Sequence, residues 1–467
     1  MTPVTCFAGK QAAVFGLGGS GLVTAQALAA GGASVLVWDD NAQAREKARL
    51  AGLRIENLAL ADWPSFDSLV LSPGVPLTHP APHWTVQMAH RAGVEIIGDI
   101  ELFCRERRKI APGSPFVAIT GTNGKSTTTA LAAHLYRSFG YETEVGGNIG
   151  TPVLALAPPS KERVHVIECS SFQIDLAASL DPSVGVLLNV TPDHLDRHGT
   201  MENYAAIKAR LVEKADLAVI GMDDPITSAI ALTRLESGRM TTCVSATKAQ
   251  TGARNDAIFL EGTKVLRHRS GTTAVVADLA GIASLRGTHN AQNAAAAVAA
   301  LGPLGLDLDR VTIGLRSFPG LPHRLEEVGR KGKVLFVNDS KATNADAAEK
   351  ALLSFDNIFW IAGGRAKTGG IAPLRPLFNK IVKAYLIGEA AELFAQQIGD
   401  AFPYECCGTL EAAVPAAWHD AKGSELEEPA VLLSPAAASF DQFADFEKRG
   451  DWFRTLVQAL LEGKTSV

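Results

Sequence analysis

Cysteine is sparse in this chain and is never grouped as a metal motif. The 467 residues include six cysteines, with no C-x-x-C pair and no histidine at the spacing of a zinc site. Scattered thiols of this kind are typical of reduced cysteines in a cytoplasmic protein. We therefore expect a cytoplasmic location and no zinc motif.

Long apolar runs and blocks of basic residues are also missing. Nowhere do 18 apolar residues follow one another, so we expect neither a membrane span nor a secretory signal. Lysine and arginine together number 44 against 49 aspartates and glutamates, a formal net charge of −5. This balance predicts no nucleic-acid partner and no membrane-surface partner. We expect a monomer that acts on small molecules.

Glycine, by contrast, is abundant. The chain has 43 glycines and 47% hydrophobic residues, which is typical of an α/β protein with many turns between strands and helices. Its length predicts about three domains of roughly 150 residues each. A charged and then turn-rich stretch at 105–115 and the segment at 319–322 are the expected linkers. We predict α/β domains over 1–111, 112–319 and 320–467.

The first glycine-rich turn lies near the N-terminus. The motif Gly16-x-Gly18-x-x-Gly21 follows an apolar run, and the next apolar run ends in Asp39 and Asp40. This order is the dinucleotide fingerprint, in which an acidic residue about twenty positions further on holds a ribose hydroxyl. The same turn serves other diphosphates, and sometimes only close helix packing. The motif alone therefore leaves an NAD-dependent oxidoreductase as one alternative.

The second glycine-rich turn organises the centre of the chain. Gly121-Thr-Asn-Gly-Lys-Ser126 lies between a predicted buried strand at 116–119 and a predicted helix. Backbone N–H groups and the helix N-terminus bind phosphate there, Lys125 can reach the terminal phosphates, and the Ser126 hydroxyl can ligate Mg²⁺. The spacing G-x-x-x-x-G-K-[ST] would need glycine at Ile119. We predict a tight nucleoside triphosphate loop, with a plain glycine turn as the alternative.

Two polar groups follow later predicted strands. Glu168 ends a predicted strand at the edge where α/β sheets place ligands, so it is a candidate Mg²⁺ ligand. A helix cap or a surface acid is its ordinary alternative. His194 lies between Asp193 and Asp196, after the predicted strand at 184–190. For this histidine a satisfied loop position is the alternative.

A lysine lies on the apolar face of the predicted helix at 204–215. Tyr204, Lys208 and Leu211 recur at helical spacing. Burial would lower the pKa of Lys208 and leave a neutral amine able to accept CO₂. Snorkelling of the ammonium toward water is the alternative that the pattern leaves open.

The last third of the chain repeats one arrangement. Predicted strands at 334–337, 358–362 and 431–433 each end in glycine or in small and polar residues, as expected for a site along one edge of a parallel sheet. Upstream, Asn290 and Asn293 lie three apart on one predicted helical face and can bind a base or a phosphate. Helix capping is the alternative for either residue.

Six segments together resemble one family, the Mur ligases, in the family's order over nearly the whole chain. They are Gly121-Thr-Asn-Gly-Lys-Ser126, Glu168-Cys-Ser-Ser-Phe-Gln173, 189–197, His289-Asn-Ala-Gln-Asn293, Leu321-Pro-His-Arg324 and 338–344. Within the family, 339–343 and 433–443 resemble the members that add D-glutamate. The resemblance implies ATP-dependent ligation in peptidoglycan precursor synthesis, through an acyl phosphate, with UDP-N-acetylmuramoyl-L-alanine and D-glutamate as substrates. It also implies a Rossmann-like N-terminal domain, a central P-loop ATPase-like parallel sheet and a Rossmann-like C-terminal domain.

The resemblance also implies a role for each matching residue. The expected ATP contacts are Gly121, Thr122, Asn123, Gly124, Lys125, Ser126, Thr127, Asn290, Asn293, Arg324, Asp339 and Lys341. The expected UDP-substrate contacts are Gly18, Gly19, Ser20, Asp39, Asp40, Asn148 and His194, and the expected D-glutamate contacts are Thr343, Lys367, Ser439 and Phe446. The expected catalytic residues are Lys125, Glu168, His194 and Lys208. Two Mg²⁺ ions are expected on Ser126, Glu168, His194 and Lys208, the last as a carbamate.

Three alternatives stand beside a D-glutamate ligase. One is a sister Mur ligase that adds another amino acid, the second is the NAD-dependent oxidoreductase, and the third is a regulatory protein that ATP switches without ligation. Binding of NAD, or ATP turnover indifferent to both substrates, would favour the second or the third.

Overall fold

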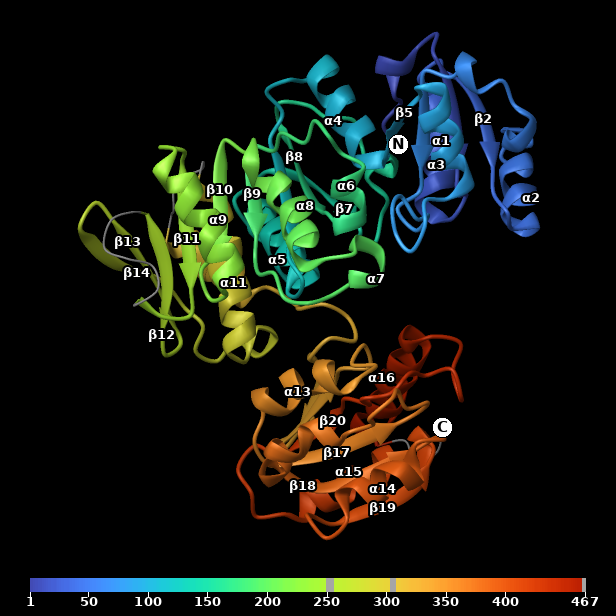
Figure 1. The fold of residues 1–467 in the computed structure, drawn as a ribbon. Helices are drawn as coiled ribbons and strands as arrows, with labels where there is room; N and C mark the ends of the chain where they lie inside the picture. The colour runs from blue at the N-terminus through green and yellow to red at the C-terminus, as the bar shows by residue number, and fades with distance from the viewer. Residues whose placement is uncertain (249–255, 303–307, 464–467) are drawn as a thin grey trace. The chain divides into compact units, whose positions relative to one another are not determined.

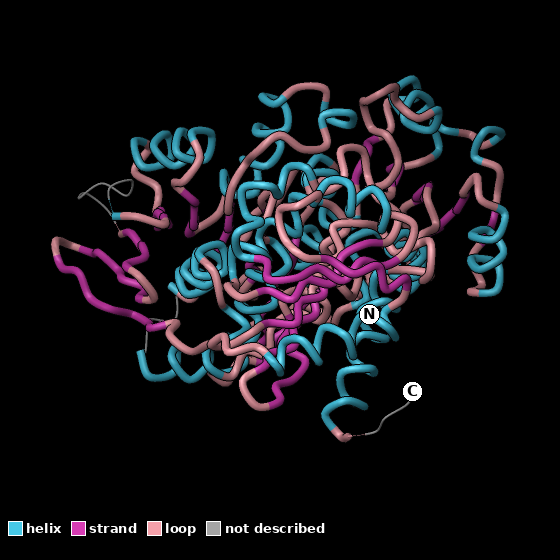
Figure 2. The backbone as a smooth tube through the Cα atoms, turned by 90° about the horizontal axis from the view of Figure 1, so that it is seen from below, coloured by secondary structure: helices cyan, strands magenta, loops and turns pink. Residues whose placement is uncertain are grey.

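The computed structural model describes residues 1–248, 256–302 and 308–463. Its strands form three sheets that are mainly parallel, with helices in the connections (Figures 1 and 2). The chain divides into two compact units, Met1–Ala280 with Gln292–Arg316, and Gly281–Ala291 with Ser317–Val467. The first unit contains two of the sheets and the second unit contains the third. The expected α/β class is confirmed, and the domain boundaries at 111 and 319 stay predictions.

The first sheet is entirely parallel, with strand order β3-β2-β1-β4-β5. Its strands are β1 (Gln11–Phe15), β2 (Ser34–Trp38), β3 (Arg54–Ile55), β4 (Ser68–Leu71) and β5 (Glu95–Ile97). The helices that follow are α1 (Gly19–Ala30), α2 (Ala42–Leu50), α3 (Trp84–Ala92) and α4 (Asp99–Ile110). Parallel strands need such crossover helices, which cover the apolar faces of the sheet.

The second sheet has the order β14-β13-β12-β11-β10-β9-β6-β8-β7. Its strands are β6 (Phe116–Thr120), β7 (Glu142–Gly147), β8 (Arg163–Glu168), β9 (Val184–Leu187), β10 (Leu217–Gly221), β11 (Thr241–Ser245), β12 (Ala257–Glu261), β13 (Lys264–Arg269) and β14 (Thr272–Asp278). All neighbours pair in parallel except β12 with β13 and β13 with β14. The helices of this part are α5 (Lys125–Ser138), α6 (Ser171–Asp175), α7 (Leu195–His198), α8 (Met201–Glu213), α9 (Pro225–Glu236), α11 (Thr288–Ala300) and α12 (Leu308–Arg316).

The third sheet has the order β15-β16-β20-β17-β18-β19. Its strands are β15 (Glu326–Lys331), β16 (Val334–Asn338), β17 (Ile358–Gly363), β18 (Ile381–Ile387), β19 (Tyr404–Gly408) and β20 (Ala430–Leu433), and only β15 runs antiparallel to its neighbour. Its helices are α13 (Ala345–Ser354), α14 (Ala391–Ile398), α15 (Leu410–Gly423) and α16 (Phe446–Leu461). Alternate residues of β16 enter two different apolar clusters, Leu335 one and Phe336 the other. Both faces of this sheet are therefore covered.

The structure adjusts several predicted elements. The strand expected at 184–190 ends at Leu187, and the helix expected at 204–215 runs over Met201–Glu213. The strands β11 to β14 lie in a stretch where the sequence alternates only weakly, so they were not predicted individually. Among the described residues, no helix has both the length and the apolar character needed to cross a membrane.

The turn between β1 and α1 depends on close backbone packing. Gly16 has a φ of +90°, and a Cβ added at Gly21 would lie 1.8 Å from the carbonyl oxygen of Gly16. The third glycine of the motif is thus required by the approach of helix to strand.

This crowding predicts a difference between two glycines of one motif. Gly21→Ala should lower the free energy of unfolding by about 1–3 kcal/mol, because the added methyl group must push the turn apart. Gly18→Ala is the matched control, since a Cβ there meets no atom within 4 Å. Urea denaturation of both variants measures the difference, and equal losses would contradict the packing account.

Candidate active site

The phosphate-binding loop, residues 121–124, joins β6 to α5. Gly124 precedes the helix with a φ of +84°, and a Cβ there would lie 2.3 Å from Oδ1 of Asn293. A Cβ at Gly121 would lie 2.9 Å from Cβ of Leu188. Both glycines are therefore required by close approach, and the loop presents the N-terminus of a 14-residue helix to an anion.

Asn189, two residues beyond β9, fixes the shape of this loop. Its Oδ1 accepts a hydrogen bond from the backbone N–H of Asn123 at 2.8 Å, and its Nδ2 donates to the carbonyl of Asn123 at 3.2 Å. Its own carbonyl accepts from the N–H of Thr122 at 2.9 Å. Three hydrogen bonds from one residue thus hold the loop in place before any ligand arrives.

Two lysine amines converge on a single loop carbonyl. Nζ of Lys125 donates to the carbonyls of Gly121 at 3.0 Å and Thr122 at 2.9 Å. Nζ of Lys208 donates to the same Gly121 carbonyl at 2.8 Å and lies 3.3 Å from the hydroxyl of Thr120. Lys208 is only 1% exposed. The expected place of Lys208 on the apolar face is therefore confirmed, and its amine does not snorkel to water.

Burial changes the chemistry of Lys208. Removal from water, and after it the positive charge of Lys125, lower the pKa of its amine from 10.5 to about 7. About half of these amines are neutral near pH 7, and a neutral amine is nucleophilic. The side chain is therefore suited to combine with CO₂.

Glu168 ends β8 with one oxygen paired and the other free. Its Oε1 accepts from Nδ2 of Asn148 at 2.7 Å. Its Oε2 is buried without a hydrogen-bond partner among the described residues. An orphaned carboxylate oxygen of this kind fits a hard cation such as Mg²⁺. The structure thus brings Asn148 and Glu168 together, as expected of neighbours at one sheet edge.

Among the described residues, His194 is not part of a preformed cluster of metal ligands. It precedes α7 with a φ of 51°, and its Nε2 lies 3.3 Å from Oδ2 of Asp193. The centroid of its ring lies 5.0 Å from that of Phe172, which also stacks on the buried His198. In the part of the chain that the structure describes, no three His, Cys, Asp or Glu side chains form a ready metal site. The two-ion site stays a prediction.

Five of the expected UDP-substrate residues lie at the turns after β1 and β2 of the first sheet, namely Gly18, Gly19, Ser20, Asp39 and Asp40, whereas Asn148 and His194 follow strands of the second sheet. Asp39 accepts from the N–H of Leu17 at 2.6 Å and from that of Asn41 at 2.8 Å, so its carboxylate shapes the turn itself. Arg197 of α7 donates to the carbonyls of Gly74 at 3.1 Å and Val75 at 3.0 Å. These bonds tie the loop after β4 to the segment that carries His194.

In the second unit, most of the expected ATP and D-glutamate residues follow β16 and β20, while Arg324 precedes β15 and Lys367 follows β17. Asp339 accepts from the hydroxyl of Ser434 at 2.7 Å, and burial raises its pKa to about 7. Nζ of Lys341 lies 5.3 Å from the ring centroid of Phe446. Ser439 follows β20 in the sequence, and its side chain is buried. The structure therefore places Lys341 beside Phe446, and leaves the ligand roles of all these residues as predictions.

Arg449 is a buried residue of this region that sequence reasoning missed. The side chain is 1% exposed, and its guanidinium donates to the carbonyls of Ser340 at 2.8 Å and Ala437 at 3.0 Å. It thereby joins the loop after β16 to the loop after β20. Arginine usually indicates an exposed helix face, but Arg449, Phe453 and Leu456 recur at helical spacing on the buried side.

Comparison with known proteins relates these loops to one family. Residues 10–98 match the model described as Mur ligase MurD-like, N-terminal domain, and residues 119–301 match the Mur ligase middle domain. A Nitrobacter hamburgensis protein named UDP-N-acetylmuramoylalanine--D-glutamate ligase is 61% identical over 98% of both chains. The Rhizobium meliloti protein of the same name is 58% identical over 98% of both chains. The chain belongs to the Mur ligase family.

Solved Mur ligases share the fold at low sequence identity. The UDP-N-acetylmuramate-alanine ligase of Thermotoga maritima has a TM-score of 0.57 at 18% identity, over 97% of this chain and 100% of that chain. A MurF structure from Acinetobacter baumannii has a TM-score of 0.55 at 20% identity, over 78% of this chain and 80% of that chain. Mur ligases are ATP-dependent and generally use Mg²⁺. The phosphate loop, Glu168 and Lys208 of this Mur ligase all lie within the matched middle domain.

The pKa of Lys208 predicts how stability changes with pH. Below about pH 7 the amine is protonated in both the folded and the unfolded state, so the folded state bears the full cost of a buried charge. Between about pH 7 and pH 10 the unfolded chain holds more protons, and the wild type gains stability as pH rises. In CO₂-free buffer, Lys208→Met should therefore be more stable than the wild type near pH 6.5, and this advantage should shrink toward pH 10.

Urea unfolding across this pH range measures the effect. Lys214→Met is the matched control, because Lys214 is exposed at the end of the same helix. A stability difference between Lys208→Met and the wild type that stays constant with pH would contradict the lowered pKa.

Proposed function

We propose that this Mur ligase joins D-glutamate to UDP-N-acetylmuramoyl-L-alanine and converts ATP to ADP and phosphate. The observation that carries the proposal is the 61% identity, over 98% of both chains, to a ligase of that name. The phosphate loop with its two convergent lysines supports an ATP-dependent reaction. The reaction belongs to peptidoglycan precursor synthesis, and a cytoplasmic monomer is the form in which we expect it.

The proposed chemistry has two steps. The carboxylate of the L-alanyl group attacks the γ-phosphorus of ATP, the bond to the β,γ-bridging oxygen breaks, and ADP leaves. The amine of D-glutamate then attacks the carbonyl carbon of the acyl phosphate. Phosphate leaves with the former carboxylate oxygen, the amine loses a proton, and an amide bond remains. Exclusion of water protects the acyl phosphate between the steps.

The phosphate loop would act by charge and position. The ammonium of Lys125 donates to two carbonyls of the loop at which the phosphates are proposed to bind. On ATP binding it would donate instead to the β- and γ-phosphate oxygens. Gly121, Thr122, Asn123, Gly124 and Thr127 complete the proposed cradle. Mg²⁺, when bound, neutralises the charge of ATP and of the attacking carboxylate.

The proposed ligands of the two Mg²⁺ ions are a carboxylate, a hydroxyl, an imidazole and a lysine carbamate. Oε2 of Glu168, which is buried and without a described partner, supplies one oxygen. The Ser126 hydroxyl, the His194 imidazole and Lys208 as a carbamate complete the proposal for two ions. A carbamate would replace a buried ammonium by an anionic oxygen ligand, which is the kind of ligand that Mg²⁺ prefers.

The remaining contacts are proposed for three ligands, the UDP substrate, ATP and D-glutamate. For the UDP substrate they are Gly18, Gly19, Ser20, Asp39, Asp40, Asn148 and His194. For ATP they include Asn290, Asn293, Arg324, Asp339 and Lys341, and for D-glutamate they are Thr343, Lys367, Ser439 and Phe446.

An amino-acid panel tests the proposed reaction. Phosphate release should require ATP, UDP-N-acetylmuramoyl-L-alanine and D-glutamate together, and L-glutamate, glycine, L-lysine and diaminopimelate should not replace D-glutamate. Lys125→Met in the same assay should lose about 100-fold or more of the rate, because transition-state charge is less well stabilised. Release with a different amino acid would assign a sister ligase, and release indifferent to both substrates would refute ligation.

A further inference from the structure

Two non-glycine residues with left-handed backbone conformation flank Arg324. His323 has a φ of 60° and Leu325 a φ of 45°. A left-handed conformation is unfavourable for a non-glycine residue, and it persists only where surrounding contacts enforce it. The contacts around His323 therefore determine how the backbone presents Arg324.

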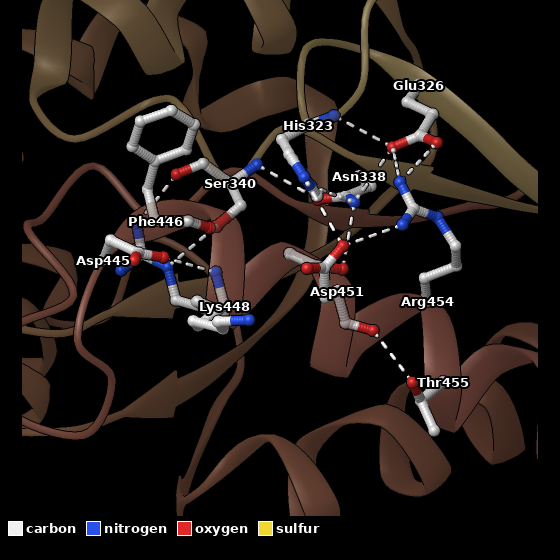
Figure 3. A network of polar contacts seen from close by, with 12 residues as sticks. His323, Glu326, Asn338, Ser340, Asp445, Phe446, Lys448, Asp451, Arg454 and Thr455 are labelled. Carbon is white, nitrogen blue, oxygen red and sulfur yellow. Dashed lines mark hydrogen bonds and ion pairs between the residues drawn. The ribbon is translucent and has the colours of Figure 1, made fainter. Parts of the chain in front are cut away.

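Asn338, the last residue of β16, is at the centre of those contacts (Figure 3). Its Nδ2 lies 3.1 Å from Oε2 of Glu326, from the carbonyl oxygen of Gly450 and from Nδ1 of His323. Its Oδ1 accepts from the N–H of Ser340 at 3.2 Å. Acceptors face the nitrogen and a donor faces the oxygen, so the amide has only one favourable orientation. The side chain is fully buried.

Glu326 and α16 close the network around the turn. Oε2 of Glu326 accepts from the N–H of His323 at 2.9 Å, and the carboxylate pairs with Arg454 of α16 at 2.8 Å. A Cβ at Gly450 would lie 2.1 Å from Nδ1 of His323, so only glycine leaves space for the imidazole. The turn, β16 and α16 therefore share one network of buried and partly buried polar groups (Figure 3).

The network also continues into the loop after β16. The N–H of Lys341 donates to the carbonyl of His323 at 3.0 Å, and the N–H of Leu325 donates to Oδ1 of Asp339 at 3.2 Å. The two residues that flank Arg324 are thus bonded to two other proposed ATP residues.

We propose that Asn338 is a positioning residue for nucleotide binding, whose amide locks the left-handed turn at His323 and so fixes the backbone from which Arg324 meets ATP. This inference rests on the ATP role proposed above for Arg324. Asn338 itself touches protein groups only, so its effect on ATP passes through its neighbours.

A double-mutant cycle on the full-length protein tests this inference, with the dissociation constant of ATP measured by calorimetry. Asn338→Leu, which keeps the size but removes the polar atoms, should weaken ATP binding about 10-fold, because several buried hydrogen bonds are lost. In an Arg324→Ala background the same change should weaken binding by a smaller factor, about 3-fold or less, because the route through Arg324 is gone and only the contacts to Asp339 and Lys341 remain. Glu326→Gln keeps an acceptor for His323 and Asn338 and should stay within about 3-fold of the wild type.

Thr455→Val is the matched control. Thr455 lies on α16 and donates to the carbonyl of Asp451 at 3.0 Å, without touching Asn338, so ATP binding should not change. If Asn338→Leu folds poorly, Glu326→Ala removes the acceptor of the same turn and should weaken ATP binding with the same dependence on Arg324. Equal effects in both backgrounds, or unchanged ATP binding in both variants, would overturn the inference. The proposed reaction is tested separately, by wild-type phosphate release.

Discussion

The contact between the Lys208 amine and the Gly121 carbonyl is the constraint on which the centre of this Mur ligase depends. The amine lies 2.8 Å from that oxygen and is almost completely buried. Lys125 donates to the same oxygen, so the amines of two lysines share one carbonyl acceptor. Desolvation and this neighbouring charge lower the pKa of Lys208 to about 7. The packing of α8 against the loop therefore shifts Lys208 from the ammonium toward the neutral, nucleophilic amine.

Parallel sheets explain why these groups meet. The loop follows β6, Glu168 ends β8 and Asn189 follows β9, and these three strands are neighbours with β6 in the middle. The carboxyl ends of parallel strands lie at one edge, so residues distant in sequence gather there. Glycine at positions 121 and 124 is then required because backbone and side chains approach too closely for a Cβ. Topology and crowding together thus shape the loop for which phosphate binding is proposed.

Sequence reasoning found the parts that depend on local pattern. The glycine turn between strand and helix, the strand ending in Glu168 and the place of Lys208 on an apolar helix face follow from apolar periodicity and glycine spacing, and the structure confirms them. Phosphate binding at that turn stays a prediction. Asn338 and Arg449 were missed because their roles come from contacts more than 100 residues away, to Gly450 and to Ser340 respectively. The strands β11 to β14 were not predicted individually because the sequence alternates only weakly between apolar and polar residues in this stretch. Tertiary contacts, which no local pattern encodes, decide these cases.

The central claim is that burial keeps the Lys208 amine neutral and able to accept CO₂, and carbon-13 NMR tests it directly. The protein is equilibrated with ¹³C-bicarbonate between about pH 7 and pH 9, where a lysine with a pKa near 7 is largely neutral. The account predicts one carbamate resonance in the wild type that is missing from Lys208→Met. Identical spectra of the two proteins across this pH range would contradict it.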